Sequence, residues 1–319
     1  MNNQEVLLNQ IRKQLLEKES INDEIASILN ISYDAAHRRV SGKSKFSIDE
    51  TVQLSKHFNI SMDNLFFQTE KIIVEKTIEI KSLSDMLQYF KNSANKIEQL
   101  TSLPNSVLYY SAKDIPLFYF MEGTILSKFK AFVWDNMLKN KQKQLSFENF
   151  VVNESFFEPM QKLKKVYEKT NVNEIWNDTT INSSLQQILY FYESGLLTLK
   201  SAMSLLKDLR RILEVIKQKS LVKTNNYALY FNELILLNNN LLFESSNSLT
   251  MFVPYTLLGY FVTDDQESCK NVRRFFEQQI GNSIHLNAAG MREQNRFFDK
   301  MNRKIDFYEA QLKDGFENL

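Results

Sequence analysis

The sequence contains few of the residues that build tight turns, disulfides and metal sites. Its 319 residues include seven glycines, four prolines, three histidines and one cysteine. A single cysteine, Cys269, excludes an internal disulfide and a cysteine-based metal cluster. Only one histidine, His285, lies beyond residue 70, which argues against a histidine-rich metal site. We therefore expect no cofactor, and the scarcity of glycine and proline favours a mainly helical fold.

Signals for an enzyme or a membrane protein are also missing. No two of the glycines lie close enough to form a phosphate-binding loop, and no set of nucleophile, base and acid is evident. No apolar run reaches the length of a membrane span, and the polar start MNNQEV is not that of a signal peptide. We expect a soluble cytoplasmic protein that is not an enzyme.

Charge is balanced over the chain but not within every segment. Lysine and arginine number 39, and aspartate and glutamate number 38. Residues 1–70 have a net charge of −2, whereas a protein that binds nucleic acid through bulk charge would be basic. Phosphate contacts, however, need only a local patch. Such a patch is present in residues 35–48, which contain no acid and include Arg38, Arg39, Lys43 and Lys45.

Residues 21–40 have the pattern of a helix-turn-helix. Asn30 occupies the turn, where a left-handed backbone is needed and asparagine tolerates it. Ser32 is a natural N-cap for the second helix, Tyr33–Val40. The first helix turns an apolar face inward, formed by Ile25, Ala26 and Leu29.

The wider segment, residues 4–66, resembles the Cro/phage-repressor (XRE) type of helix-turn-helix, which has five helices. Ser47 and Glu50 have the spacing of a capping box. The resemblance covers about a fifth of the chain. It implies a DNA-binding domain whose recognition helix enters the major groove, although a helix-turn-helix can also serve only as a protein-interaction module. The helices expected outside the motif are Gln4–Glu17, Ser47–Phe58 and Ser61–Leu65.

Two positions depart from the pattern of this family. Arg39 stands where the family usually has an apolar residue late in the recognition helix, and Val40 stands where it often has glutamate. Val40 lies four residues after Ala36, so it can take over the core contact. Arg39 is then expected to lie across the helix and to pair with Glu24 or with Glu50.

The direction of the recognition helix assigns roles to the residues around it. Arg38 is the best candidate for a bidentate contact with guanine. Asp34 could accept a hydrogen bond from a cytosine amine, or it could simply favour the helix N-terminus. The predicted base contacts are Ser32, Tyr33, Asp34, His37 and Arg38, and the predicted phosphate contacts are Asn22, Lys43, Ser44 and Lys45.

We divide the chain into a DNA-binding domain (1–70), a linker with a connecting helix (71–104) and a regulatory and oligomerisation domain (105–319). The alternating pattern of residues 71–81 predicts an extended linker or a strand. Ser82 is a candidate cap for a helix running to about Gln99. That helix could be a dimerisation stem or could pack on its own domain.

The third domain is expected to be mostly helical with a small antiparallel β meander. The meander is predicted for residues 226–264, where β-branched and aromatic runs alternate with the turn compositions NNN and SSNS. Residues 103–119 are expected to form a strand or a loop. The predicted helices are Leu117–Lys139, Phe156–Lys169, Ile181–Ser194, Leu196–Gln218, Asp265–Gly281 (capped by Thr263) and Met291–Lys313. The fold class is therefore mainly α.

Aromatic residues make up 12% of the chain and occur in clusters. They could line an apolar ligand pocket, but aromatic clusters also dominate ordinary cores, and we favour the core. The clusters are Tyr109–Phe120, Phe129–Trp134, Phe147–Phe157, Tyr190–Tyr192 and Tyr227–Phe231.

Three functions are compared with these features. The first is a sequence-specific transcriptional regulator that binds double-stranded DNA as a homodimer and could also sense a small-molecule or peptide effector. The second is a peptide-sensing regulator of the Rgg-like kind, against which the missing 34-residue repeat and the β meander count. The third is an enzyme fused to a DNA-binding domain, for which no site is visible. We favour the first, and we expect no membrane partner.

Overall fold

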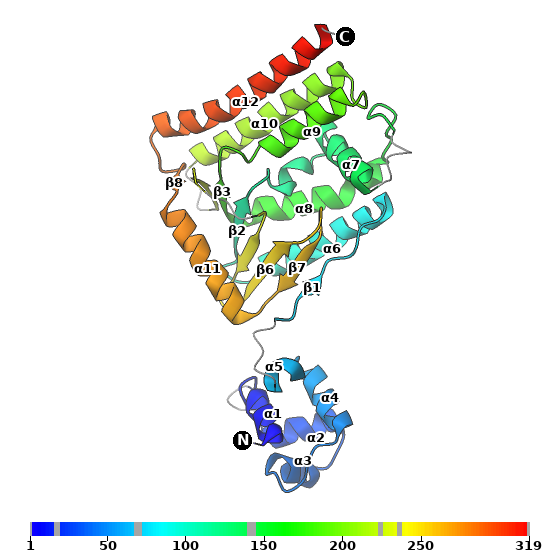
Figure 1. Ribbon diagram of the computed structural model, residues 1–319. Helices are drawn as coiled ribbons and strands as arrows, with labels where there is room; N and C mark the ends of the chain where they lie inside the picture. Colours follow the sequence, from blue (N-terminus) through cyan, green and yellow to red (C-terminus); the bar gives the residue numbers. More distant parts are fainter. Residues whose placement is uncertain are drawn as a thin grey trace. The chain divides into compact units, whose positions relative to one another are not determined.

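The computed structural model describes residues 2–15, 20–66, 72–138, 145–222, 226–234 and 238–317. The chain divides into two compact units, Met1–Ile73 and Val74–Leu319 (Figure 1). The described part of the N-terminal unit is helical, and the C-terminal unit is built around a β-sheet. Within the described ranges, no helix is both long enough and apolar enough to span a membrane.

The N-terminal unit has the five-helix arrangement predicted from the sequence. Ser47 and Glu50 form the expected capping box. The first helix ends at Arg12, and Glu17, its expected end, lies outside the described residues. The helices are α1 (Asn3–Arg12), α2 (Ile21–Leu29), α3 (Tyr33–Val40), α4 (Ile48–His57) and α5 (Met62–Phe66). Their core consists of Leu7, Leu8, Ile11, Ile25, Leu29, Ala36 and Leu54.

The C-terminal unit contains an eight-stranded sheet in the order β1-β7-β6-β5-β2-β3-β4-β8. Three adjacent strands, β2, β3 and β4, run parallel, and the other pairs are antiparallel. The strands are β1 (Glu75–Lys76), β2 (Val107–Ala112), β3 (Asn171–Trp176), β4 (Tyr227–Phe231), β5 (Leu241–Glu244), β6 (Leu249–Pro254), β7 (Tyr260–Thr263) and β8 (Ile284–His285).

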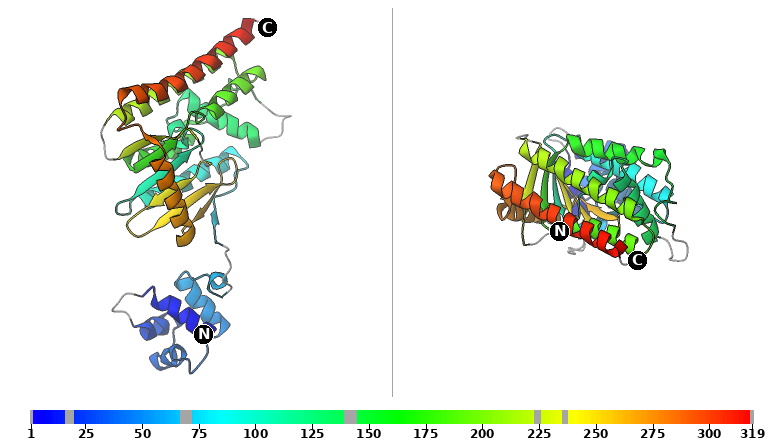
Figure 2. Two further views of the ribbon diagram at one scale, coloured as in Figure 1. Left: turned by 60° about the vertical axis from the view of Figure 1, so that its left-hand side comes forward. Right: turned by 90° about the horizontal axis from the view of Figure 1, so that it is seen from above.

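Helices cover both faces of the sheet (Figure 2). On one face, α11 (Gln266–Gly281) packs on β5 and β6. A parallel pair needs a crossover connection, and the helices that connect the parallel strands pack on the other face. The helix that precedes β2 and the helix that follows β8 belong to the same layer. This layer contains α6 (Leu83–Thr101), η1 (Leu117–Phe120), α7 (Ile125–Leu138), η3 (Glu154–Phe156), α8 (Glu158–Lys169), α9 (Asn182–Glu193), α10 (Leu199–Leu221) and α12 (Met291–Glu317).

Phenylalanine rings fill the core under this helical layer. Phe132 meets Phe147 and Phe191 edge to face, with ring centroids 5.5 and 4.9 Å apart. Phe90 of α6 is buried in the same core, so α6 packs within the C-terminal unit. The prediction that the aromatic clusters build a core is confirmed for Phe132, Phe147 and Phe191.

The predicted β meander is confirmed for residues 241–263 but is wrong for residues 227–231, and the sheet extends beyond it. β5, β6 and β7 form consecutive antiparallel pairs. In contrast, β4 pairs in parallel with β3, a strand that the sequence did not indicate. The sequence of β3 is NVNEIW, and its polar residues conceal a strand because a buried strand of a parallel sheet is usually apolar.

Two predicted helix starts are corrected by the structure. The expected helix from Leu117 is interrupted, because the chain turns at Gly123 with a φ of +79° before α7 begins. The cap of α11 is Asp265 rather than Thr263. Its carboxylate accepts a hydrogen bond of 2.8 Å from the backbone N–H of Ser268.

Candidate nucleic-acid interface

The turn between α2 and α3 has the geometry predicted for a helix-turn-helix. Asn30 adopts a left-handed conformation with a φ of 51°. The next N–H, of Ile31, returns a hydrogen bond of 3.0 Å to the carbonyl of Ala26. The Ser32 hydroxyl then caps α3 by accepting from the N–H of Ala35 at 3.3 Å. These local bonds fix the direction in which α3 leaves the turn.

The inner side of α3 anchors it to the unit. Ala36 is completely buried, and Val40 packs against the same core. Val40 therefore supplies the core contact that the sequence predicts for it. Because one side of an eight-residue helix is used in this way, the opposite side is left to solvent.

Arg39 forms an ion pair with Glu50, one of the two partners predicted for it. Its guanidinium donates to the carboxylate at 3.0 and 2.6 Å, and it also donates to the carbonyl of Ala35 at 3.1 Å. The hydrogen bond from Arg39 lowers the pKa of Glu50 below its ordinary value. Arg39 thus ties α3 to α4, and its charge is neutralised within the unit.

The five predicted base-contacting residues all lie on the solvent side of α3 or at its start, where each is exposed. The rings of Tyr33 and His37 are stacked one turn apart, with centroids 6.5 Å apart and planes 4° apart. No described residue forms an ion pair with Arg38, so its guanidinium is available. The remaining members of this face are Ser32 and Asp34.

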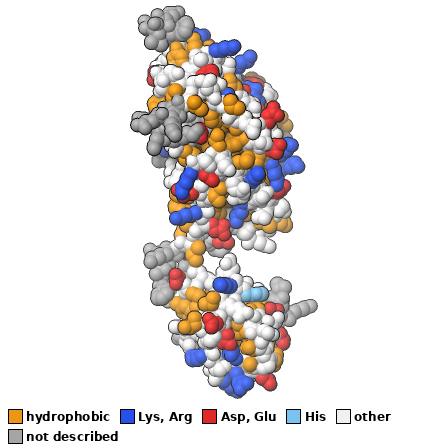
Figure 3. All heavy atoms as spheres, turned by 90° about the vertical axis from the view of Figure 1, so that its right-hand side faces the viewer, with side chains coloured by type: hydrophobic (Ala, Val, Ile, Leu, Met, Phe, Trp, Pro, Cys, Tyr) orange, Lys and Arg blue, Asp and Glu red, His pale blue; other side chains and the backbone are white. Residues whose placement is uncertain are grey.

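The loop after α3 presents two of the predicted phosphate contacts. Lys43 and Lys45 are exposed, and neither is ion-paired with a described residue. Figure 3 shows Lys and Arg side chains gathered at the end of the N-terminal unit where α3 lies in Figure 1. The Ser44 hydroxyl, in contrast, is buried and has no described hydrogen-bond partner. The Ser44 hydroxyl is therefore not exposed to solvent as the two lysine side chains are.

Asn22, in α2, lies beside α3. Its amide nitrogen donates a hydrogen bond of 3.2 Å to the hydroxyl of Tyr33. Its carbonyl oxygen is buried without a described partner. A phosphate at Asn22 would therefore have to share this amide with Tyr33.

Gln4 of α1 holds the loop after α3 in place. Its amide nitrogen donates to the carbonyls of Arg39 and Ser44 at 2.7 and 2.9 Å, and its amide oxygen accepts from the N–H of Phe46 at 3.0 Å. Three bonds to backbone groups fix the loop that presents Lys43 and Lys45. Nothing in the sequence singles out this glutamine, because its partners lie 35 to 42 residues away.

Comparison with known families assigns a domain to this part of the chain. Residues 2–103 match the model of the BetR domain family, a helix-turn-helix-type regulatory domain. The match includes the described helices of the N-terminal unit and continues through β1 and α6 of the C-terminal unit. No curated protein and no solved structure matches the chain. The narrower resemblance to the XRE type stays a prediction.

Proposed function

We propose that this protein is a sequence-specific transcriptional regulator, not an enzyme, that binds double-stranded DNA as a homodimer. The observation that supports this most directly is the outer face of α3. That face has exposed hydrogen-bonding side chains and an unpaired guanidinium, while its inner side is held by Ala36 and by the Arg39–Glu50 pair. The match to a helix-turn-helix regulatory domain supports the same function.

In this proposal the face of α3 reads bases in the major groove. Arg38 would donate two hydrogen bonds to the O6 and N7 atoms of guanine. Ser32, Tyr33 and His37 would contact neighbouring base edges. Asp34 could accept from a cytosine amine or act only on the N-terminus of α3.

The small number of unpaired cations on one N-terminal unit supports binding to DNA by two such units together. Each N-terminal unit presents Arg38, Lys43 and Lys45 to DNA. Arg39 does not add to this number, since Glu50 neutralises it. Few phosphate contacts give weak binding at physiological salt, and a two-fold site doubles the number of contacts. We assign the pairing of the N-terminal units, and any response to an effector, to the C-terminal unit.

The substitution Arg38→Ala tests the role of α3. If Arg38 reads a base, the substitution should reduce the discrimination between operator and random DNA by about 1–3 kcal/mol. The matched control is Arg12→Ala, which removes an exposed arginine of α1 that bonds Asn9 at 2.7 Å. The operator comes from genome-wide recovery of bound DNA, and anisotropy titrations on both DNAs give the affinities.

The outcomes separate three roles for Arg38. Equal loss on operator and random DNA would make it a phosphate contact. An effect no larger than that of Arg12→Ala would remove α3 from the interface and overturn the proposal. The same titrations should end at two chains per operator.

A further inference from the structure

Glu174, in the parallel strand β3, is a completely buried carboxylate surrounded by uncharged donors. One oxygen accepts from the hydroxyls of Tyr119 (2.8 Å) and Tyr167, and the other accepts from the hydroxyl of Tyr227 (3.2 Å) and from the indole N–H of Trp176 (2.7 Å). Four donors occupy the acceptor positions of both oxygens, which suits the ionised form. Burial raises the pKa of Glu174, and the donors act in the opposite direction.

No described residue forms an ion pair with Glu174. The cation that acts on it is Lys219 of α10, which stabilises the carboxylate electrostatically. The Lys219 ammonium lies over two of the surrounding rings, 5.4 Å from the centroid of Tyr119 and 5.7 Å from that of Tyr227. An ammonium over two tyrosine faces, with a carboxylate behind them, is the arrangement that recognises a bound cation.

These groups lie at the wall of an open groove. The groove has a volume of about 490 Å³ and runs between the end of α8, the start of β4 and the last turns of α10. Tyr167 and Tyr227 both line it and both bond Glu174, so the carboxylate lies directly behind the wall. The rest of the wall is mostly apolar and includes Val172, Val215 and Val222.

The charges that line the groove favour a cation. Its acidic members are Glu168 and Glu214, and its one basic member among the described residues is Lys219. Glu168 is partly neutralised by Lys164 at 3.3 Å. Among the described residues, the hydrogen bond that Glu214 accepts comes from the amide of Gln218 at 2.6 Å. With Glu174 behind the wall, the acids outnumber the base.

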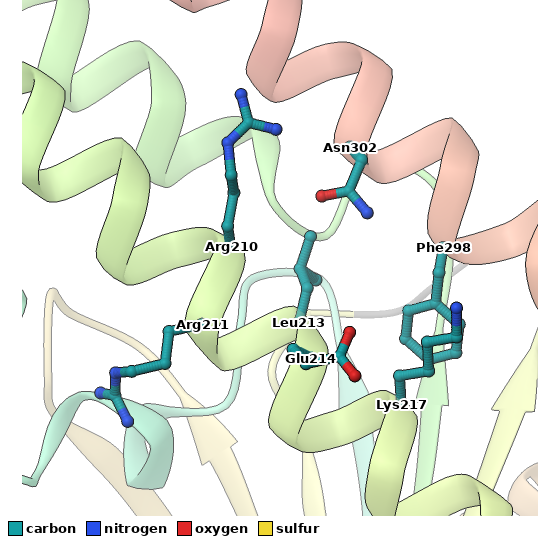
Figure 4. Close-up of a pocket in the computed structure, with 7 residues that line it drawn as sticks. All are labelled: Arg210, Arg211, Leu213, Glu214, Lys217, Phe298 and Asn302. Atoms are coloured by element: carbon teal, nitrogen blue, oxygen red, sulfur yellow. The ribbon is translucent and has the colours of Figure 1, made fainter.

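A second hollow on α10, between α10 and α12, differs in this respect (Figure 4). Its two arginines extend in different directions, and both are already paired. Arg210 meets Asp306 and Glu309 at 2.8 Å, and Arg211 meets Glu122 at 2.6 Å. A charged ligand there would have to break these pairs, so this hollow is not the stronger candidate.

We propose that the groove beside Glu174 binds a small organic amine in its protonated form. The head group of the ligand would replace the Lys219 ammonium over the tyrosine faces, and its apolar body would pack on Val172, Val215 and Val222. That the amine acts as an effector of DNA binding rests on the proposed function; the binding itself does not.

Three probes with one carbon skeleton test the charge that the groove selects. They are 3-methylbutylamine, 3-methylbutan-1-ol and 3-methylbutanoate, which present an ammonium, a hydroxyl and a carboxylate. Titration calorimetry on the full chain without DNA should show saturable binding of the amine and weaker binding of the other two. A second readout is the fluorescence of Trp176, whose indole bonds Glu174. Failure of DNA binding leaves this result unaffected, so the two proposals fail separately.

Two substitutions test the mechanism. Lys219→Met removes the internal cation and should tighten amine binding by about threefold to tenfold, the size of a partly desolvated cation–π contact. Glu174→Gln keeps the shape and removes the charge, and it should weaken amine binding by about tenfold or more. The matched control is Lys207→Met, at an exposed position of the same helix outside the groove. Lys219→Met keeps the test valid even if Glu174→Gln fails to fold.

Several results would overturn the proposal. Preferential binding of the carboxylate probe, lost in Lys219→Met, would show an anion site built on the lysine. Equal binding of the three probes would show an apolar groove without charge selection. No saturable binding of any probe, or weaker amine binding after Lys219→Met, would also refute it.

Discussion

Two glutamates, one in each unit, lie in opposite electrostatic surroundings. The side chain of Glu50 is 19% exposed, and Arg39 neutralises it. Glu174 is fully buried, and its hydrogen-bond donors among the described residues are uncharged. The arginine lowers the pKa of Glu50, whereas burial raises that of Glu174. The first glutamate holds α3 to α4 in the N-terminal unit, while the second is a buried carboxyl group beside an open groove.

The largest expected effect is at Glu174. Replacing it with alanine leaves three tyrosine hydroxyls and an indole N–H without their acceptor, and it opens a cavity. The free energy of unfolding of the C-terminal unit should fall by about 3–5 kcal/mol. Urea unfolding followed by tryptophan fluorescence measures this unit alone, because both tryptophans, Trp134 and Trp176, lie in it.

The control for this substitution is Glu193→Ala, which removes an exposed glutamate at the end of α9. It should change the free energy of unfolding by less than about 0.5 kcal/mol. If the two substitutions had similar effects, the cluster around Glu174 would contribute nothing beyond an ordinary surface carboxylate.

The Arg39–Glu50 pair should have a smaller effect on the N-terminal unit. Arg39→Ala removes a bidentate charge-assisted contact that is partly exposed, and it should destabilise a fragment of residues 1–73 by about 1–2 kcal/mol. Thermal unfolding followed by circular dichroism measures the change. A double-mutant cycle with Glu50→Ala isolates the pair, and additive effects would mean that the two side chains do not stabilise each other.

The smallest expected effect is the dependence of stability on pH, and it distinguishes the two glutamates most directly. The pKa of Glu50 is lowered from about 4.5 in the folded state, so its contribution is present above that value and is lost as pH falls through the folded pKa. The pKa of Glu174 is raised from about 4.5. Its contribution is therefore present below that value and is lost as pH rises through the folded pKa.

Glutamine variants separate these two contributions from those of other groups. Between pH 4 and pH 7, the stability of the wild type relative to Glu50→Gln should rise, and relative to Glu174→Gln it should fall. The measurements are unfolding titrations at each pH, with fragment 1–73 for Glu50 and the full chain for Glu174. If the stability difference changed with pH in the same direction at both sites, the two glutamates would not have opposite pKa shifts.

The N-terminal unit was predictable because its signals are local. Asn30 and Ser32 act on backbone groups within a few residues, and the capping box of Ser47 and Glu50 spans three positions. Such signals do not depend on the rest of the chain. For Arg39, the sequence predicts an ion pair with Glu24 or with Glu50. The packing of α4 against α3 selects Glu50.

The groove site was not predictable, because its parts are distant in sequence. Glu174 takes donors from residues 55 positions before it and 53 after it. β3 also lacks the apolar run of a buried strand, since Glu174 itself interrupts it. Only the pairing of β3 with β2 and β4 makes this polar segment a strand and buries its carboxylate.

By itself, the sequence determined the five helices of the N-terminal unit, the turn and caps of its helix-turn-helix, and the residues that face outward from α3. These features are local, because a helix and its ends are specified by neighbouring residues. The tertiary structure decided which charges remain available. It neutralised Arg39 through Glu50, buried the Ser44 hydroxyl, fixed the basic loop through Gln4, and assembled Glu174 with Tyr119, Tyr167 and Tyr227. The physical reason is that a side chain's charge and solvation depend on which distant groups pack against it.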